Sequence, residues 1–126
     1  MKSQLSLDPQ GRNHIRSVSA EGLRIGDAVY AGSVIVAPDA VIEDWPPASL
    51  ESLEEEHFSA VLAFKPEVVL LGTGATQRFL HPGRLAPLYR AGIGVETMTT
   101  AAACRTYNIL VAEERRVVAA LLPHDA

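Results

Sequence analysis

Three apolar runs in the second half of the chain constrain its fold more than any other feature. The runs are "PEVVLL", "GIGVETM" and "RRVVAALL", and the segments between them can form helices. An apolar run without polar alternation is typical of a strand covered on both faces, and strands that alternate with helices indicate parallel βαβ units. We therefore expect strands at 67–71, 93–97 and 116–121 to lie parallel and mutually adjacent in one sheet.

Helices are expected at 52–64, 84–91 and 99–112. Ser52 and Glu55 fit a capping box that would start the first helix. Pro87 falls in or just past the first turn of the second helix, which should therefore be short or bent. Thr99 or Thr100 can cap the third helix, and three alanines follow it. Helical spacing predicts the residues of this third helix that pack on the sheet: Ala103, Tyr107, Leu110 and Val111.

The preceding stretch, "HIRSVSAEGLRIGDAVYAGSVIVAP", consists of short β-branched pieces separated by turn residues. It predicts an antiparallel β region, to which "VIEDW" can add a strand before two prolines interrupt the ladder. Residues 1–13 are polar and should form a flexible tail, followed by a single domain over 14–126. The expected fold class is α/β (α+β): a layered β+β/α domain in which the antiparallel region precedes a small parallel sheet with crossover helices.

Charge and cysteine usage exclude several classes of protein. The formal net charge of −4 and the pI near 5.5 argue against binding to nucleic acid. The first residues, "MKSQLSLDPQGRNH", lack the apolar stretch of a signal peptide, and no run is long enough to span a bilayer. The single Cys104 cannot form an intramolecular disulfide, so we expect a cytoplasmic protein. The four histidines are scattered, which predicts neither a metal site nor a cofactor.

The first apolar run ends in "GTGATQRF", which raises the question of a phosphate-binding loop. The dinucleotide fingerprint fails because Gln77 stands where the third glycine belongs, and the lysine of a P-loop is missing. We therefore interpret the two glycines as positions of positive φ or close backbone approach. A small-anion site remains the alternative, because the loops after 67–71 and 93–97 would leave the same sheet edge. Its residues would be Gly72, Thr73, Gly74, Arg78, Thr97 and Thr99.

The other face of the 99–112 helix carries Arg105 and Asn108, flanked by Ala101 and Ala112. Small residues let another surface approach, and arginine is enriched at interface hot spots, so we interpret this face as a protein-interaction surface. A solvated face, or an internal network that holds Arg105, is the alternative. Cys104 lies beyond the turn where the helix dipole is strongest, so we interpret it as a packing residue and expect no catalytic residue.

The segments "KPEVVLLGTGATQRFL" and "AGIGVETMTTAAACRTYNILVAEERRVVAALLP" resemble the Mth-type family of small domains of unknown function. That family includes mitochondrial respiratory complex I assembly factor three and the adipogenesis-associated Mth-domain protein. The similarity is close over 65–123 and looser back to about residue 28, and "TAAACRTYN" is its most specific string. Gly83 and Pro87 depart from the family pattern, in which better helix formers are usual.

The resemblance implies a layered β+β/α domain and a non-enzymatic protein-interaction module. Respiratory-complex subunits or another assembly factor would be its protein partners, and a homo-oligomer is also open. The alternative function is a small-anion or metabolite-binding protein that uses the loop 72–74 and the start of the 99–112 helix.

Overall fold

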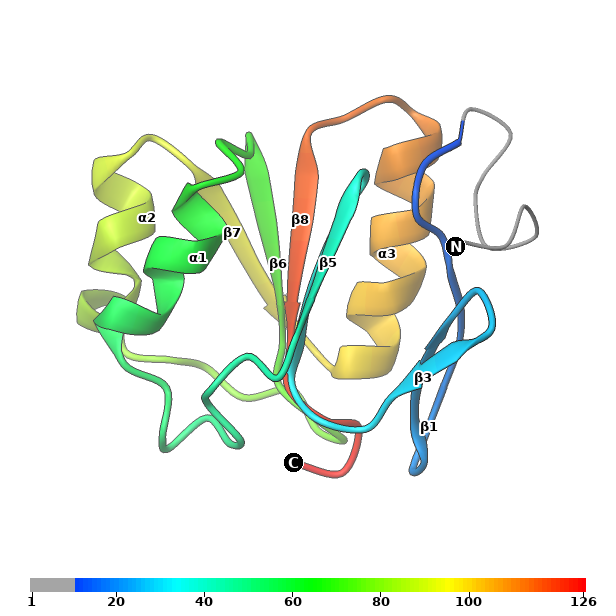
Figure 1. The fold of residues 1–126 in the computed structure, drawn as a ribbon. Helices are drawn as coiled ribbons and strands as arrows, with labels where there is room; N and C mark the ends of the chain where they lie inside the picture. Colours follow the sequence, from blue (N-terminus) through cyan, green and yellow to red (C-terminus); the bar gives the residue numbers. More distant parts are fainter. Residues whose placement is uncertain (1–10) are drawn as a thin grey trace.

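A five-stranded mixed sheet forms the centre of the computed structural model, which describes residues 11–126. The strands run in the order β5-β4-β8-β6-β7, and helices cover both faces of the sheet (Figure 1). The short helices α1 (Ser59–Leu62) and α2 (Ala86–Arg90) lie on one face, and α3 (Thr100–Ala112) lies on the other. The strands are β4 (Val34–Ala37), β5 (Ala40–Glu43), β6 (Val68–Gly72), β7 (Gly94–Met98) and β8 (Val117–Leu121).

The three strands expected from the apolar runs are present and parallel. β6 pairs with β7 on one side and with β8 on the other, so β7 and β8 are each adjacent to β6 and not to one another. Every residue of β6 and β8 is buried, as continuous apolar runs require, because these strands have neighbours on both edges and helices on both faces. β7 lies at the edge of the sheet, and its residues are at least partly exposed.

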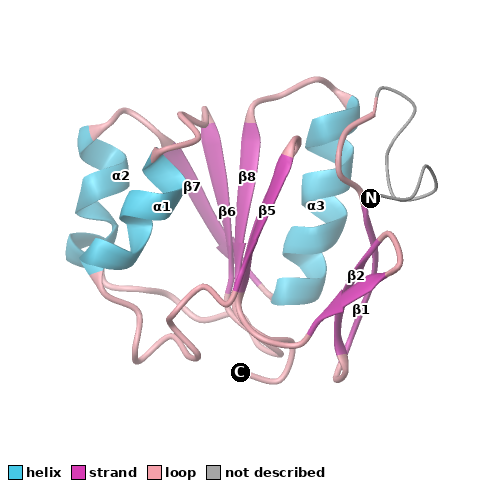
Figure 2. Cartoon of the chain, viewed as in Figure 1, coloured by secondary structure: helices cyan, strands magenta, loops and turns pink. Residues whose placement is uncertain are grey.

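The predicted antiparallel β region is divided between two sheets. Its first part forms a separate three-stranded sheet on the α3 side of the molecule (Figure 2), with the strands β1 (Ile15–Ser19), β2 (Gly22–Ile25) and β3 (Ala28–Tyr30). Its second part, β4 and β5, extends the main sheet, because β4 pairs antiparallel with β8. The four residues of β4 are all buried. The neighbouring strand β8 covers one edge of β4 and so helps to bury them.

The first helix begins later than expected. A 3₁₀ turn, η2 (Glu55–Phe58), precedes α1, and the Ser52 hydroxyl donates to the Ser49 carbonyl (3.0 Å) in a turn ahead of it. The predicted box of Ser52 and Glu55 is therefore wrong, and the Glu54 N–H donates to His57 Nδ1 (2.9 Å) instead. A second 3₁₀ turn, η3 (Pro82–Leu85), leads into the short α2. Within residues 11–126, no helix is long and apolar enough to cross a membrane.

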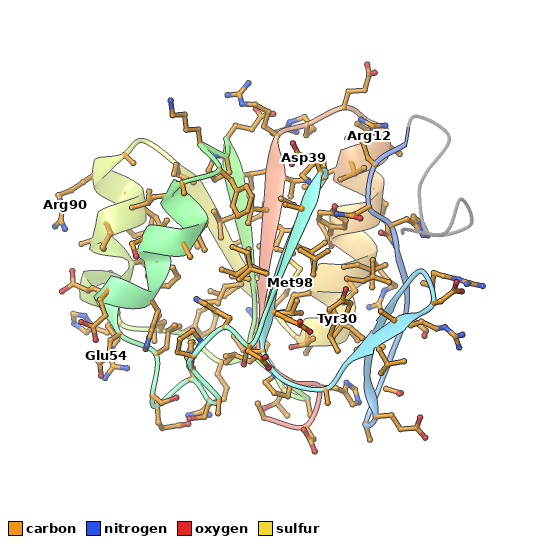
Figure 3. All side chains as sticks on the ribbon, in the orientation of Figure 1. Arg12, Tyr30, Asp39, Glu54, Arg90 and Met98 are labelled. Carbon is orange, nitrogen blue, oxygen red and sulfur yellow. The ribbon has the colours of Figure 1, made fainter. Side chains whose placement is uncertain are left out.

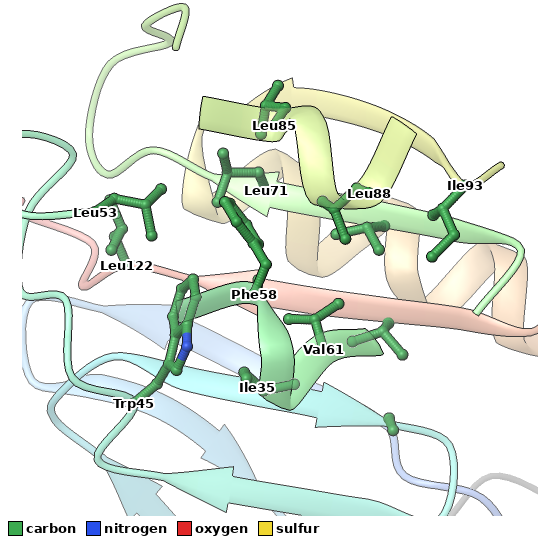
Figure 4. Close-up of a cluster of buried hydrophobic side chains, with 14 of the residues drawn as sticks. Ile35, Trp45, Leu53, Phe58, Val61, Leu71, Leu85, Leu88, Ile93 and Leu122 are labelled. Atoms are coloured by element: carbon green, nitrogen blue, oxygen red, sulfur yellow. The ribbon is translucent and has the colours of Figure 1, made fainter. Parts of the chain in front are cut away.

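Two clusters of buried side chains hold the layers together, one on each face of the sheet. The cluster under α1 and α2 includes Trp45, Phe58 and Leu71 (Figure 4). The cluster under α3 includes Leu70 and Tyr107. Neighbouring residues of β6 thus point to opposite clusters, as the two-residue period of a strand requires. Full burial of one such large apolar side chain contributes about 1.5–3 kcal/mol, so both clusters are needed for a stable domain.

The chain before β1 is anchored to both α3 and the main sheet. Residues 1–10 of the expected tail lie outside the described residues, but Asn13, placed in that tail from sequence, is fully buried. Its N–H donates to the Pro38 carbonyl (2.7 Å), and its Nδ2 donates to the Ala37 carbonyl (2.8 Å). The Tyr107 hydroxyl donates to the Asn13 carbonyl (3.2 Å). Asn13 therefore belongs to the folded domain.

Candidate functional site

The carboxyl ends of β6 and β7 meet at one edge of the sheet, as the small-anion hypothesis requires. Gly72 and Met98 are partners in the parallel register, and α3 begins just beyond Met98. The C-terminus of the chain lies at this same end of the molecule, at the bottom of Figure 1. We call this region the carboxyl end. It brings together the predicted loop 72–74 and the start of α3.

Hydrogen bonds within the chain already occupy the polar groups of this loop. The Gly74 N–H donates to Thr100 Oγ1 (2.9 Å), and that hydroxyl donates to the Leu122 carbonyl (2.8 Å). The Thr73 N–H donates to the Met98 carbonyl (2.8 Å), and the Thr100 N–H donates to the Gly74 carbonyl (3.0 Å). Thr73 and Thr100 are both buried. An anion at this loop would have to break bonds that the fold has made.

The two glycines of the loop serve backbone geometry. Gly74 has a φ of 99°, and a Cβ on it would lie 2.3 Å from the backbone oxygen of Ala126. A Cβ on Gly72 would lie 2.9 Å from Thr100 Oγ1 and 3.0 Å from Thr100 Cα. Gly72 therefore lets α3 approach the sheet, and Gly74 turns the chain beneath the C-terminal segment. These contacts support the structural interpretation of the glycines.

Arg78 and Thr99 of the small-anion hypothesis are also engaged within the chain. The Arg78 guanidinium forms an ion pair with Glu51, and its hydrogen bond lowers the pKa of that carboxyl group. The Thr99 hydroxyl accepts from the Ala102 N–H (3.1 Å) and so caps α3. At Thr97 it is the backbone carbonyl that accepts from Gln77 Nε2 (3.2 Å), and not the hydroxyl through which an anion would bind. The carboxyl end is thus a network of bonds that joins β6, α3 and the C-terminal segment.

Cys104 lies in the cluster under α3, where burial raises the pKa of its thiol to about 12, opposed by the nearby Arg105. The thiol is therefore neutral at physiological pH, and a neutral thiol is a poor nucleophile. This placement supports the interpretation of Cys104 as a packing residue. Across residues 11–126, no group of three or more His, Cys, Asp or Glu side chains is arranged to hold a metal ion.

The two residues of the predicted interaction face have different surroundings. Asn108 Oδ1 accepts from the Ile15 N–H (2.9 Å), and Asn108 Nδ2 donates to the Ile15 carbonyl (2.8 Å). The amide thus pairs with β1 as a neighbouring strand would, and it links the three-stranded sheet to α3. Arg105 is exposed. Of the predicted pair, Arg105 is therefore the residue that a partner protein could contact without loss of this link.

Sequence analysis missed a large apolar residue beside Arg105. Ile109 is 58% exposed, although isoleucine is usually buried. It lies four residues after Arg105 and three before the exposed Ala112, so the three side chains share one face of the helix. We call this face the α3 stripe. The position of Ile109, one helical turn after Arg105, was the feature of the sequence that could have placed it on this face.

Comparison with known proteins gives one family and several relatives. Residues 15–122 match the family described as "Protein of unknown function (DUF498/DUF598)". "NADH dehydrogenase [ubiquinone] 1 alpha subcomplex assembly factor 3" of Danio rerio is 37% identical over 114 residues, which cover 89% of this chain and 65% of that protein. The chain thus spans less than two thirds of the length of this curated relative.

Solved structures give the same fold. A crystal structure of a protein from Bordetella parapertussis has a TM-score of 0.83 and 36% identity, and the match covers 89% of this chain and 96% of that one. A solution NMR structure from Bordetella pertussis, described as a Mth938-like domain, has a TM-score of 0.80 and 30% identity. That match covers 90% of this chain and 87% of the other. The Mth-type fold expected from the sequence is confirmed.

Proposed function

The chain belongs to the family of proteins of unknown function DUF498/DUF598, and we propose that it is a non-enzymatic protein-interaction module in the assembly of an NADH dehydrogenase complex. The observation that carries this proposal is the similarity to an assembly factor of such a complex over 89% of the chain. Because that relative is longer, the proposal concerns the role of the shared domain. The cytoplasm is the compartment we propose, because the single cysteine is buried and not paired.

The surface we propose for this interaction is the α3 stripe. Arg105 offers a charged fork, Ile109 offers an apolar side chain, and Ala112 leaves room for another backbone. Interface hot spots combine packed apolar anchors with arginine, whose planar head hydrogen-bonds while its stem packs. The stripe therefore suits a protein that carries a carboxylate beside a small apolar pocket. A subunit of the complex, another assembly factor or a second copy of this chain can supply such a surface.

A genetic test measures whether the protein contributes to assembly of the complex. The gene is deleted in the source organism, and the amount of assembled NADH dehydrogenase complex is measured on native gels. We expect a loss of assembled complex that the unchanged gene restores. Ile109→Asp and Arg105→Glu should fail to restore it, because a new carboxylate opposes both the apolar contact and the charge contact. Both purified variants should melt as the unchanged protein does, because surface substitutions usually have small effects on stability.

The matched control is Tyr89→Asp on α2. Tyr89 is 51% exposed and belongs to α2, which lies on the opposite face of the sheet from α3, so this variant should restore assembly fully. If deletion leaves the amount of complex unchanged, the assembly role is wrong. If deletion lowers it but all three variants restore it, the role stands and the α3 stripe is not the contact surface.

A further inference from the structure

A cavity of about 360 Å³ opens at the opposite end of the sheet, where β6 and β8 begin. Its walls come from the β4–β5 turn, the segment between α1 and β6, the start of β8 and the chain before β1. Figure 3 labels Arg12 and Asp39 at this upper end of the molecule. We call this region the amino end, because the parallel strands start here. The volume lies within the range of about 300–1,000 Å³ that is usual for small-molecule sites.

The cavity combines an apolar wall with charged groups. The apolar part includes Pro38, Phe64 and Val118, and the charged side chains are Arg12, Arg116 and Asp39. Arg12 already has an interaction partner in the structure, so Arg116 is the arginine of the lining that we consider for a ligand. A mostly apolar cavity with a few charged groups is the usual composition of a site for a small organic molecule.

Hydrogen bonds fix one wall of this cavity in place. The carbonyls of Ala37 and Pro38 accept from Asn13, which is itself fully buried and bonded to Tyr107. The β4–β5 turn is therefore held against the chain before β1. A wall that is fixed before a ligand arrives lowers the entropy lost on binding.

Glu67 fixes the other wall and leaves the Arg116 side chain available. Glu67 Oε1 accepts from the Arg116 N–H (2.9 Å) and from Arg115 Nε (3.1 Å), and the Glu67 N–H donates to the Arg116 carbonyl (2.9 Å). These bonds, the one from the Arg116 N–H first, lower the pKa of the Glu67 carboxyl group. Within residues 11–126, the Arg116 guanidinium itself forms no hydrogen bond or ion pair.

We propose that this cavity binds a small organic monoanion, in which a carboxylate is attached to a compact apolar body. The carboxylate pairs with the guanidinium of Arg116, whose planar fork matches the two oxygens of a carboxylate. The apolar body packs against Phe64 and Val118 in the cavity. Asp39 in the lining disfavours a second negative charge on the ligand, so a monoanion fits better than a dianion. This inference is independent of the assembly role, since it uses none of the α3 stripe.

Binding can be tested with benzoate and hexanoate as probes on the ¹⁵N-labelled full chain. Amide chemical shifts are followed during each titration, with benzyl alcohol, 1-hexanol and acetate as controls. We expect both carboxylates to bind saturably and to shift the amides of 37–39, 64–67 and 116–118. The alcohols lack the charge and acetate lacks the apolar body, so each should bind at least about tenfold more weakly.

Arg116→Gln removes the guanidinium and keeps the backbone N–H that Glu67 needs. We expect it to weaken benzoate binding by about tenfold or more, because a charge-assisted pair is lost. Arg90→Gln makes the same charge change at an exposed position of α2 that does not line the cavity, so it should leave the affinity unchanged. The comparison of benzoate with benzyl alcohol on the unchanged chain remains decisive even if Arg116→Gln does not fold.

Three results would overturn the proposal. The first is that neither carboxylate produces saturable shifts at concentrations up to about 10 mM, which corresponds to a very weak interaction. The second is that the shifts map to α3 or to the carboxyl end. The third is that benzyl alcohol binds as tightly as benzoate, or that Arg90→Gln weakens binding as much as Arg116→Gln does.

Discussion

The two ends of the central sheet use the same kinds of polar group in different ways. At the carboxyl end, the Thr100 hydroxyl and the amides of the loop 72–74 bond to one another and to the C-terminal segment. At the amino end, Glu67 and Asn13 hold the backbone around a cavity, and among residues 11–126 the Arg116 guanidinium makes no hydrogen bond or ion pair. Open α/β sheets usually bind ligands at the carboxyl ends of their strands, and here the N–H groups of Thr73 and Gly74 at that end already bond within the chain.

This comparison teaches that a glycine-rich turn after a buried strand is not in itself a ligand site. A backbone N–H can bind an anion only if nothing in the chain already accepts from it. At Gly74 the acceptor is the hydroxyl of a threonine in the following helix. The availability of the donors, more than the presence of the motif, distinguishes a ligand-binding loop from a structural connection.

The largest expected effect follows from replacing the central hydroxyl of the carboxyl end. Thr100→Val keeps the side-chain shape but leaves the Gly74 N–H and the Leu122 carbonyl without their bonds, in a position that is fully buried. Because one buried unsatisfied group costs about 1–3 kcal/mol, we expect a loss of roughly 3 kcal/mol in the free energy of unfolding. Urea denaturation measures this loss.

Thr97→Val on β7 is the matched control, because the Thr97 side chain is partly exposed at the same edge. It should change the free energy of unfolding by less than about 0.5 kcal/mol. If Thr100→Val is as stable as the unchanged protein, the hydroxyl bonds do not close this end, and the contrast with the amino end disappears.

A smaller loss is expected for Gly74→Ala, about 1–2 kcal/mol in the same measurement. Its control is Gly92→Ala. Both glycines have positive φ, 99° and 75°, but a Cβ on Gly92 would meet nothing within 4 Å. Gly92→Ala therefore measures the loss of stability from the positive φ alone. Gly74→Ala adds the loss from the steric contact with Ala126.

Deletion of Ala126 should recover part of the loss in Gly74→Ala and none of the loss in Gly92→Ala. Equal losses for the two alanine variants, with no recovery on deletion, would mean that the C-terminal segment does not press on the loop. The carboxyl end would then be less tightly closed than the contacts indicate.

The smallest effect concerns Glu67 at the amino end and depends on pH. The bonds from the Arg116 N–H and from Arg115 lower the pKa of its carboxyl group below the usual 4.5. A carboxyl group with a lowered pKa in the folded state stabilises the fold above about pH 4.5, and this contribution is lost as the pH falls through the folded-state value. Glu67→Gln should therefore be less stable than the unchanged protein near neutral pH, and this difference should shrink in acid.

Urea denaturation at several values from about pH 7 to about pH 3 tests this expectation. Since Glu51 at the carboxyl end also has a lowered pKa, Glu51→Gln provides the comparison between the two ends. A difference between Glu67→Gln and the unchanged protein that stays constant with pH would show that the charge of Glu67 does not hold the cavity wall.

Local patterns predicted the elements whose formation depends on nearby residues. The unbroken apolar runs of β6 and β8 reflect burial on both faces, which any sequence in such a position must satisfy. Thr99 caps α3 because an N-cap needs only a hydroxyl close to the first turn. The start of α2 follows from Pro87 in its first turn, where proline is tolerated, and Gly92, with a φ of 75°, follows its end. In these cases the cause and the effect lie within a few residues of each other.

The boundaries that failed were those with competing local partners. Ser52 could have capped a helix, but its hydroxyl donates to the Ser49 carbonyl, and the helical segment starts after Glu54. Both arrangements satisfy the serine locally, so the sequence pattern does not choose between them.

The sequence by itself therefore determined the parallel strands, the long helix and the family to which the chain is related. The tertiary structure decided that β4 lies beside β8, that Asn108 pairs with Ile15, and that the Gly74 N–H bonds to Thr100 while a cavity lined by Arg116 opens at the amino end. Asn108 and Ile15 are 93 positions apart in the chain. Burial and helix capping are imposed residue by residue, whereas the choice of a distant partner depends on which polar groups the packed layers bring within hydrogen-bond reach.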